Sequence, residues 1–508
     1  MKKTFAIICL MLCATVSFAQ DSLRLPGIVR SSQSYLIADY TARDTAFLHQ
    51  KCRQAGLLLG HHVLVNRIPT TSRLVTPKPS EHLLRQGVMQ LLMPLDDQQT
   101  EIAVYHSDLL NLSSTLNVLL IDNELIVYHS AESTSNINLL YNCKRGAFGT
   151  QKAAHALNAN VYKLWDTPER TLLPDLELQD QMAQTVARQY AKTDYPLLIF
   201  NDLESYAYNE YGDEAIRHLL DTIHKYNPDK MLQGDLLTPN SCRYLSRVNE
   251  NMLWNASMRT KIVETLTEKQ ALYRDAMMPW MIGNFRIQLA DRMKTATTME
   301  ELEWFLSNAA AFDAGFGLEF DVEAMRHHGL TDAMLDAVSL WESLRQAQAF
   351  SDAQKELFKD PYASWHLEKA DTAFCLYPQH VSRRYLCNLS DDSWTWNSPY
   401  ESRFALRIAV EGKGSISELE LRTPNGILRF PCTVKAGQFL IYNYDKTAFI
   451  TDQNYNKIAE VTALGVSVLD EGESEVTFSC EVTAEGQRKP SVAIRYITRG
   501  EAQEVRIP

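Results

Sequence analysis

Cysteine is scarce in this chain, which has nine cysteines among 508 residues. The seven that follow residue 20 are scattered singly, with no Cys-x-x-Cys pair and no cysteine–histidine spacing typical of zinc. A chain of this length does not need disulfides to hold a core. We therefore expect isolated buried thiols and no metal or other cofactor, with a Cys375–Cys387 disulfide as the alternative.

Positive charge is also in short supply, since 50 lysines and arginines face 62 aspartates and glutamates, for a formal net charge of −12. Nucleic acids and anionic membranes attract basic surfaces, so this balance argues against both as partners. Beyond the first twenty residues, no apolar run approaches the ~20 residues that a membrane span requires. A Walker loop, a Rossmann glycine fingerprint, a Gly-x-Ser-x-Gly elbow and a His-Glu-x-x-His pair are absent as well.

The first twenty residues have the composition of a signal peptide. Lys2 and Lys3 precede an apolar stretch from Phe5 to Cys13, and a small-x-small cleavage site follows at Ser17–Ala19. Cleavage there removes two positive charges and makes the mature chain more acidic still. We expect an exported protein, periplasmic or secreted, whose mature part begins at residue 21.

Residues 166–368 alternate long helical patterns with short apolar runs, which is typical of a parallel sheet or barrel. The expected helices are 177–193, 213–225, 258–274, 298–313 and 331–350. The expected strands are 196–201, 231–235, 252–254, 280–285 and 315–320. Most of these runs end in polar or aromatic residues, where a barrel carries its chemistry.

Residues 21–76 add an earlier part of the same pattern, with strands at 34–38 and 57–65 around a helix at 44–56. Residues 77–165 interrupt it with short β runs at 101–105, 116–121 and 124–128, the last two joined by a hairpin turn at Asp122-Asn123. Seven barrel strands can be counted, so closure with eight is an assumption. The interruption indicates a small β domain inserted between early barrel strands.

Residues 369–508 lose helical periodicity and gain alternating strands separated by turn residues. These strands are expected at 404–410, 417–422, 426–430, 438–444, 475–483 and 491–498. The pattern predicts an antiparallel sandwich. The fold class is therefore α/β, a TIM-like (β/α) barrel with an inserted small β domain and a C-terminal antiparallel β-sandwich. For Trp394 and Trp396 in the sandwich, we expect packing in the core rather than a glycan-binding platform.

The insert contains Arg145-Gly-Ala-Phe-Gly149-Thr150 followed by Ala153-Ala-His155. This motif resembles a small β module found as an accessory in phage tail fibres and in some bacterial carbohydrate-active proteins. Its residues favour a structural role, because the glycines permit tight turns and Arg145 and Thr150 can bond the loop backbone. Contact with a ligand is the alternative.

The barrel portion resembles exported TIM-barrel glycoside hydrolases of bacterial polysaccharide-utilisation systems that carry a C-terminal jelly roll. The resemblance rests on three short motifs, Gly60-His61-His62, Leu198–Glu204 and Gly317–Asp321, and on the domain order. At the second motif such relatives read Phe-Asp-Gly-Leu-Glu. Here Asn201 takes the first acidic position and Asp202 replaces the glycine, whereas Glu204 matches directly.

Glycosidic hydrolysis uses two carboxylates, one that donates a proton and one that acts as nucleophile or base. Asp202 and Glu204 follow an apolar strand and, at i and i+2, face one side with Cα atoms roughly 6.5 Å apart. We predict Glu204 as the general acid. The second carboxylate is Asp235 or Glu319, which also end strands, or Asp202 in the manner of chitinase-like barrels that act on N-acetylated sugars.

Sugar rings stack on flat apolar faces and use amides and imidazoles as hydrogen-bond partners. Residues of these kinds lie at or near the expected strand ends. The candidate substrate-binding residues are His61, His62, Trp254, Asn255, Trp280 and Asn284. Packing is the alternative for the tryptophans, and His327 and His328 are expected at the surface. The sequence predicts a glycosidase acting on a carbohydrate; the main alternative is a non-catalytic glycan-binding protein on a degenerate barrel.

Overall fold

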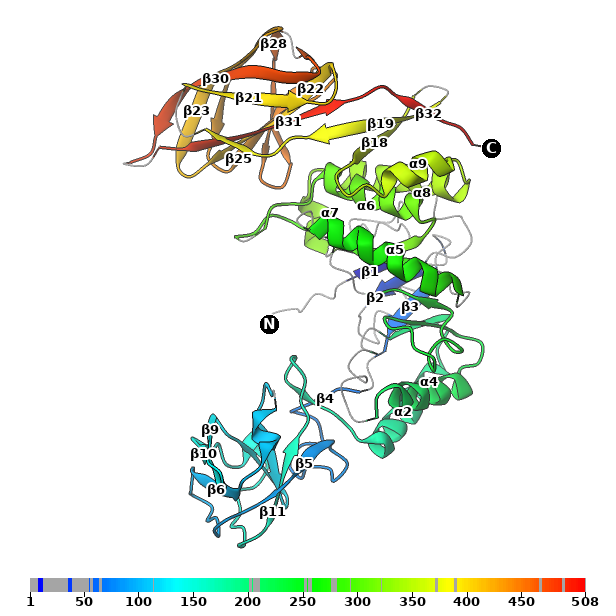
Figure 1. Cartoon of the computed structure of the whole chain (residues 1–508), viewed down its shortest axis with the longest axis vertical. Coiled ribbons are helices and arrows are strands. Elements are labelled where there is room, and N and C mark those ends of the chain that lie inside the picture. Colours follow the sequence, from blue (N-terminus) through cyan, green and yellow to red (C-terminus); the bar gives the residue numbers. More distant parts are fainter. Residues whose placement is uncertain are drawn as a thin grey trace. The chain divides into compact units, whose positions relative to one another are not determined.

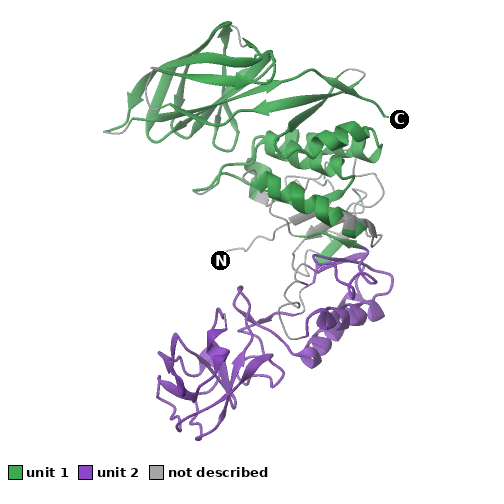
Figure 2. Ribbon diagram, viewed as in Figure 1, with its two compact units in different colours: residues 1–61, 247–508 green, residues 62–246 purple. Residues whose placement is uncertain are grey.

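The computed structural model describes most of the chain beyond residue 57 and a few residues before it. The described residues are 8–11, 35–38, 54, 58–63, 66–112, 114–200, 203, 211–250, 254, 258–275, 281–292, 294–320, 322–370, 373–387, 391–465, 468–486 and 489–507. They divide into two compact units, residues 1–61 with 247–508 (unit 1) and residues 62–246 (unit 2), coloured separately in Figure 2. Both units mix helices and strands.

Unit 2 contains a β-α-β segment made of β13 (Leu197–Phe200), α4 (Asp213–Tyr226) and β14 (Met231–Gly234). The two strands pair in parallel. All four residues of β13 are buried, as expected for a strand of a covered parallel sheet. Helix α2 (Leu176–Tyr190) packs beside α4, and the Gln179 side chain donates to the Ala215 carbonyl at 2.8 Å. The sequence predicted these elements to within a few residues.

Unit 2 also contains an antiparallel β module (Figure 1). Its strands are β4 (Ile68–Pro69), β5 (Arg85–Gln90), β6 (Ile102–Tyr105), β7 (Val118–Ile121), β8 (Glu124–Val127), β9 (Ser130–Ser133), β10 (Ile137–Tyr141), β11 (Asn160–Leu164) and β12 (Thr171–Leu172). They form sheets in the orders β5-β11-β7-β8, β6-β10-β9 and β12-β4. The hairpin at Asp122-Asn123 is confirmed, because β7 and β8 pair across it and Asp122 has a positive φ of 51°.

Unit 1 contains a second parallel pair, β16 (Met281–Arg286) and β17 (Gly315–Phe320), joined by α6 (Met299–Ala311). Strands β2 (Tyr35–Ala38) and β3 (Leu58–His62) also pair in parallel. The remaining elements of its α/β part are β1 (Ile8–Met11), β15 (Arg247–Val248), α5 (Arg259–Asp275), α7 (Val322–His327), α8 (Thr331–Gln346) and α9 (Asp352–Phe358).

Strand β1 departs from the expected parallel arrangement. It lies between β2 and β17, antiparallel to both, and its residues belong to the expected signal peptide. Cleavage at residue 20 would remove it from this position. A strand was also expected at 252–254, but Trp254 lies outside the described strands. The fold is mixed α/β with two parallel β-α-β segments, and a closed barrel stays a prediction.

The C-terminal part of unit 1 is an antiparallel sandwich. Its strands are β18 (Ser364–Lys369), β19 (Phe374–Val381), β20 (Tyr385–Cys387), β21 (Asp391–Ser398), β22 (Ser402–Glu411), β23 (Gly414–Thr423), β24 (Gly426–Lys435), β25 (Gln438–Tyr442), β26 (Ala448–Asp452), β27 (Lys457–Val461), β28 (Leu464–Gly465), β29 (Val468–Leu469), β30 (Gly472–Ala484), β31 (Ser491–Arg499) and β32 (Gln503–Val505). One sheet follows the order β18-β19-β31-β22-β25-β26-β27 and the other β21-β30-β23-β24-β28.

The two sheets enclose one apolar core, in which Trp396 is fully buried. Trp394 packs against that core and stacks on Tyr385, with ring centroids 5.7 Å apart. The structure therefore supports core packing for both tryptophans. Cys375 and Cys387 are both free thiols. A jelly-roll connectivity stays a prediction. Within the described residues, no helix is both long and apolar enough to cross a membrane.

Candidate active site

Four of the predicted site residues, Asp202, Glu204, Asn255 and Trp280, lie outside the described residues. The structure describes the other six, which are His61, His62, Asp235, Trp254, Asn284 and Glu319. Most of these lie at or just beyond the carboxyl ends of strands, and they belong to different units.

In unit 1, Glu319 is the centre of a polar network on neighbouring parallel strands. Glu319 of β17 is in register with Arg286 of β16. Arg286 donates to Glu319 Oε2 from Nη2 at 2.9 Å and from Nε at 3.2 Å, and Asn284 donates to Oε1 at 3.1 Å. The donors converge because Asn284 and Arg286 are two residues apart on β16 and share one face. The side chain of Glu319 keeps 21% of its surface exposed.

Asn249 extends this network and was not singled out from the sequence. Its side-chain amide donates to Asn284 Oδ1 at 2.8 Å, which orients the amide that reaches Glu319. Asn249 is 2% exposed and directly follows β15. The sequence signal was a polar residue after a two-residue strand, which is too short to recognise by periodicity. The network presents an accessible carboxylate held by one cation and one amide.

Trp254 in unit 1 makes the contacts of a packing residue. Its indole nitrogen donates to the carbonyl oxygen of Ile282 at 2.9 Å. Its ring meets Trp304 and Phe305 edge-on, with centroids 5.1 and 4.6 Å away. The side chain is half-buried. These contacts favour the packing alternative, and the role of a sugar platform stays a prediction.

In unit 2, Asp235 anchors the backbone between the two predicted acids. It directly follows β14, is 5% exposed, and its Oδ1 accepts a hydrogen bond from the backbone nitrogen of Leu203 at 3.0 Å. Leu203, between Asp202 and Glu204, is 1% exposed. A Cβ on Gly234 would approach the Leu203 side chain to 2.6 Å, so the absence of a side chain there allows this packing. Asp235 therefore has the environment of a positioning residue.

His61 and His62 end β3 and are both half-buried. The next residue, Val63, donates its backbone N–H to the carbonyl oxygen of Ile199 in β13 at 2.7 Å. Of the other expected histidines, His327 is exposed, but His328 is 3% exposed and its Nε2 donates to the Thr297 carbonyl oxygen at 2.9 Å. The surface position expected for His328 is therefore wrong. Among the described residues, no group of three or more His, Cys, Asp or Glu side chains is arranged so that it could hold a metal ion.

The loop of the β module that contains Arg145 and His155 is a folding element built around Glu124. Arg145 forms a double hydrogen bond to Glu124, with both N···O distances 2.8 Å, and His155 Nε2 lies 2.9 Å from the same carboxylate. The backbone nitrogens of Gly146 and Ala153 also donate to it, at 2.7 and 3.0 Å. Burial alone would raise the pKa of Glu124, but these hydrogen bonds outweigh it and lower the pKa to about 2.

Arg145 and Thr150 bond the loop backbone, as the sequence indicated. Arg145 donates to the carbonyl oxygens of Asp96, Gln99 and Ala153. Thr150 Oγ1 accepts from the Leu125 backbone nitrogen and donates to the Ala147 carbonyl, both at 3.0 Å. The side chains of Arg145 and Glu124 are 1% and 0% exposed, so this network has no surface for a ligand. The structure therefore favours the folding role.

No protein-family model matches the chain, and no curated protein matches it. Solved structures do match at low identity. A GH27 β-L-arabinopyranosidase from Geobacillus stearothermophilus, in complex with arabinose, is 11% identical over 62% of this chain and 65% of its own, with a TM-score of 0.26. This chain thus spans less than two thirds of that enzyme's length.

Two further structures match over more of the chain. An Anoxybacillus α-amylase is 9% identical, covering 88% of this chain and 81% of its own, with a TM-score of 0.31. A debranching enzyme from Nostoc punctiforme is 7% identical, covering 86% and 79%, with a TM-score of 0.32. All three proteins are glycoside hydrolases by name, but matches at these scores do not establish a common fold.

Proposed function

We propose that the chain is a glycoside hydrolase in which Glu204 is the general acid. The observation that carries this proposal is the hydrogen bond from the Leu203 backbone to the buried carboxylate of Asp235. Burying a carboxylate is costly unless it is well bonded. A buried acid that holds the backbone next to Glu204 supports the proposal, because a reacting carboxylate must be placed precisely.

The second carboxylate is Asp202 or Glu319, and the structure favours neither. Asp202 would act with Glu204 on a substrate whose acetamide serves as the internal nucleophile. Glu319 would act directly as nucleophile or base, because Arg286 and Asn284 hold its carboxylate while part of it stays exposed. Asp235 was an equal candidate from the sequence, but its burial and its hydrogen bond from Leu203 support a positioning role instead. We further propose that the protein is exported and that its N-terminal twenty residues act as the signal peptide.

The test compares residues 21–508 with the same protein carrying Glu204→Gln, incubated with plant, algal, microbial and host glycans. Release of new reducing ends is expected from the parent and is expected to fall about 100-fold or more in the variant, the usual worth of acid–base catalysis. Glu264→Gln is the matched control, because Glu264 is exposed on α5. It is expected to keep full activity.

The outcomes separate the alternatives. Equal cleavage by the parent and by Glu204→Gln would reject Glu204 as the acid while keeping the enzyme. Saturable binding of a glycan with no cleavage by the parent would favour the non-catalytic glycan-binding protein instead.

A further inference from the structure

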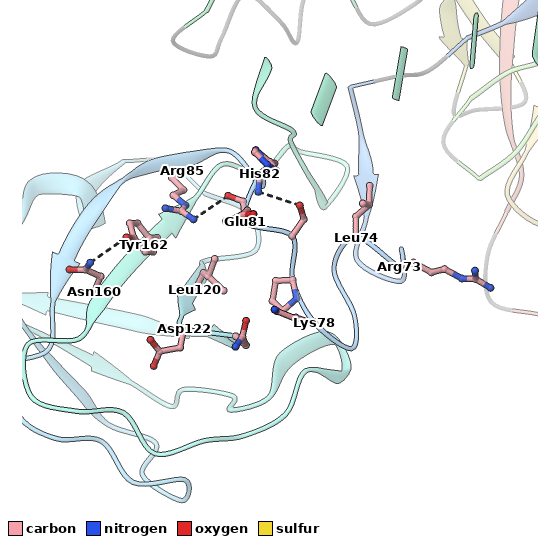
Figure 3. A pocket seen from close by; sticks show the side chains of 13 residues that line it. Arg73, Leu74, Lys78, Glu81, His82, Arg85, Leu120, Asp122, Asn160 and Tyr162 are labelled. Atoms are coloured by element: carbon pink, nitrogen blue, oxygen red, sulfur yellow. Dashed lines mark hydrogen bonds between the residues drawn. The ribbon is translucent and has the colours of Figure 1, made fainter. Parts of the chain in front are cut away.

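The β module of unit 2 carries a surface hollow of about 600 Å³. Its wall is formed by the segment that leads into β5, by the β7–β8 hairpin and by the start of β11 (Figure 3). Its lining does not include Glu124, Arg145 or His155, whose side chains are buried. A volume of this size suits a ligand of one or two sugar rings.

The lining of the hollow is basic, although the chain as a whole has a net charge of −12. Lys78 and Arg85 contribute two permanent cations, and Arg73 is a third cation of the lining whose side chain extends away from the others in Figure 3. Two carboxylates, Glu81 and Asp122, also line the hollow, so its cations exceed its anions by one, and Asp122 lies 2.7 Å from His155 Nδ1. Cations gathered in a concave surface attract an anionic group, because low-dielectric walls concentrate their field.

His82 adds to this charge. It lies 2.8 Å from Asp175, and this hydrogen bond raises the pKa of His82. A larger share of His82 is therefore protonated near neutral pH than of an ordinary histidine. Because the negative charge of Asp175 partly offsets the positive charge of protonated His82, His82 adds less than one full positive charge to the hollow.

One cation of the hollow is held in place before any ligand arrives. The guanidinium carbon of Arg85 lies 3.9 Å from the centre of the Tyr162 ring, and Nη2 donates to the Glu81 carbonyl oxygen at 3.1 Å. Figure 3 shows Arg85 beside Tyr162 and Glu81. A planar guanidinium fixed on two sides loses little freedom when it binds a carboxylate or a sulfate.

Amide side chains complete the lining. Asn123 and Asn160 are both exposed at the hollow, and Asn160 Nδ2 bonds the Tyr162 hydroxyl at 3.3 Å. Amides offer both a donor and an acceptor, which suits ring hydroxyl groups. The hollow thus combines fixed positive charge for one acidic group with neutral partners for hydroxyls around it.

We propose that this hollow binds an acidic saccharide unit, a sugar ring that carries a carboxylate or a sulfate. The proposal rests on the proposed function only for the choice of a sugar over another anion. The site would hold an acidic glycan through the β module, apart from the residues assigned to hydrolysis. It therefore predicts binding that survives the loss of catalysis.

The experiment uses isothermal titration calorimetry on residues 21–508 with three oligosaccharides of equal length, one uronate-rich, one sulfated and one neutral. Binding of at least one acidic oligosaccharide and weaker binding of the neutral one are expected. Lys78→Gln is the main variant, because Lys78 is exposed, whereas Arg73 extends away from the other lining side chains in Figure 3. Its affinity for the acidic sugar is expected to fall about tenfold, the worth of one charge-assisted hydrogen bond.

Two controls make the result specific. Lys152→Gln removes an exposed lysine of the same module outside the hollow and is expected to leave the affinity unchanged. Glu204→Gln is expected to keep the binding even where it abolishes cleavage, so that failure of the hydrolase proposal and of this one are distinguishable. The proposal is overturned by equal affinity for the neutral sugar, by inorganic sulfate binding as tightly as the sulfated sugar, or by Lys78→Gln and Lys152→Gln behaving alike.

Discussion

Asp235 and Glu319 gave the same sequence signal, an acid at the end of an apolar run, yet their surroundings differ. Asp235 is 5% exposed and accepts a backbone hydrogen bond from Leu203. Glu319 is 21% exposed and is held by the side chains of Arg286 and Asn284. A buried acid that accepts a backbone hydrogen bond serves to position the chain, whereas an accessible acid held by side chains can contact a substrate. This contrast makes a test possible at a single residue.

Asp235→Ala removes the acceptor for Leu203 and is expected to lower kcat for the proposed hydrolysis by about 10- to 100-fold, because misalignment of a reacting group slows the chemical step more than it weakens substrate binding. KM is expected to change little. Asp235→Asn keeps an oxygen in the position of Oδ1 and is expected to restore most of kcat. The measurement is a KM and kcat comparison of the three proteins on the glycan that the parent cleaves.

A different result would reassign the residue. If Asp235→Asn were as inactive as Asp235→Ala while circular dichroism showed both folded, the charge of Asp235 would be needed and it would be the second carboxylate. The fold control matters because Leu203 packs tightly over Gly234.

Helix α6 shows how one element connects several others. Thr298 and Glu301 form a capping box at its start, and most of its residues are buried. Glu303, 1% exposed, accepts hydrogen bonds from the Trp341 indole of α8 at 3.3 Å and from the Leu367 backbone of β18 at 3.1 Å. His366 Nδ1 lies 2.8 Å from its other oxygen. The ion pair thus joins the helical layer to the first strand of the sandwich.

This pair predicts a pH dependence of stability. Burial alone would lower the pKa of His366, but the charge of Glu303 and the bonds to Glu303 and Glu368 outweigh it and raise the pKa from 6.5 to about 9. Because the folded pKa is the higher one, the stabilisation is complete below pH 6.5 and is lost as the pH rises to about 9. Urea unfolding at pH 6, 7.5 and 9 measures it.

His366→Gln supplies the control. At pH 6 it is expected to cost about 3 kcal/mol, because Glu303 stays buried without its cation. Above pH 9 the variant and the parent are expected to differ much less. A parent whose stability is flat from pH 6 to 9, or a variant with the same slope, would show that the pair does not carry this dependence.

The long helices were predictable at this scale, whereas the short helices α7 and α9 and the polar contacts of the helices were not. Periodicity placed α6 at 298–313, against Met299–Ala311 observed, and α8 at 331–350, against Thr331–Gln346. Helix α8 ends early because Gln348 adopts a positive φ of 54°. Glutamine rarely adopts this conformation, so the sequence does not predict it. The Glu303–His366 pair joins residues 63 apart, so no local pattern reveals it.

Part of the candidate site could likewise be predicted from the sequence, and part of it could not. Acids and amides at strand ends were predictable, because strand ends follow from apolar runs. The anchoring role of Asp235 depends on a partner 32 residues away, and Asn249 follows a strand of only two residues. The antiparallel strand β1 was not expected, since its residues have the composition of a signal peptide.

Within unit 1, the sandwich is attached to the α/β part through the hairpin between β26 and β27. Gly329, beside α7, donates its backbone N–H to the Asn454 carbonyl at 2.8 Å, and Asn456 donates its side-chain amide to the His327 carbonyl at 2.7 Å. The Tyr455 ring stacks on His328 with centroids 5.8 Å apart. Backbone meets backbone here, so the contact depends on the absence of a side chain at residue 329.

Gly329→Ala is therefore expected to weaken the attachment of the sandwich. The added Cβ would lie 2.1 Å from the Tyr455 carbonyl oxygen, a backbone atom that cannot move cheaply. Overpacking of this kind costs about 1–3 kcal/mol, and we expect lower stability in urea together with faster proteolysis in the β26–β27 hairpin. Gly437→Ala is the control, because residue 437 has a φ of 83° with nothing within 4 Å of the added atom. It is expected to cost about 1 kcal/mol through backbone strain alone and to leave the hairpin protected, so equal proteolysis of both variants would contradict this account of the attachment.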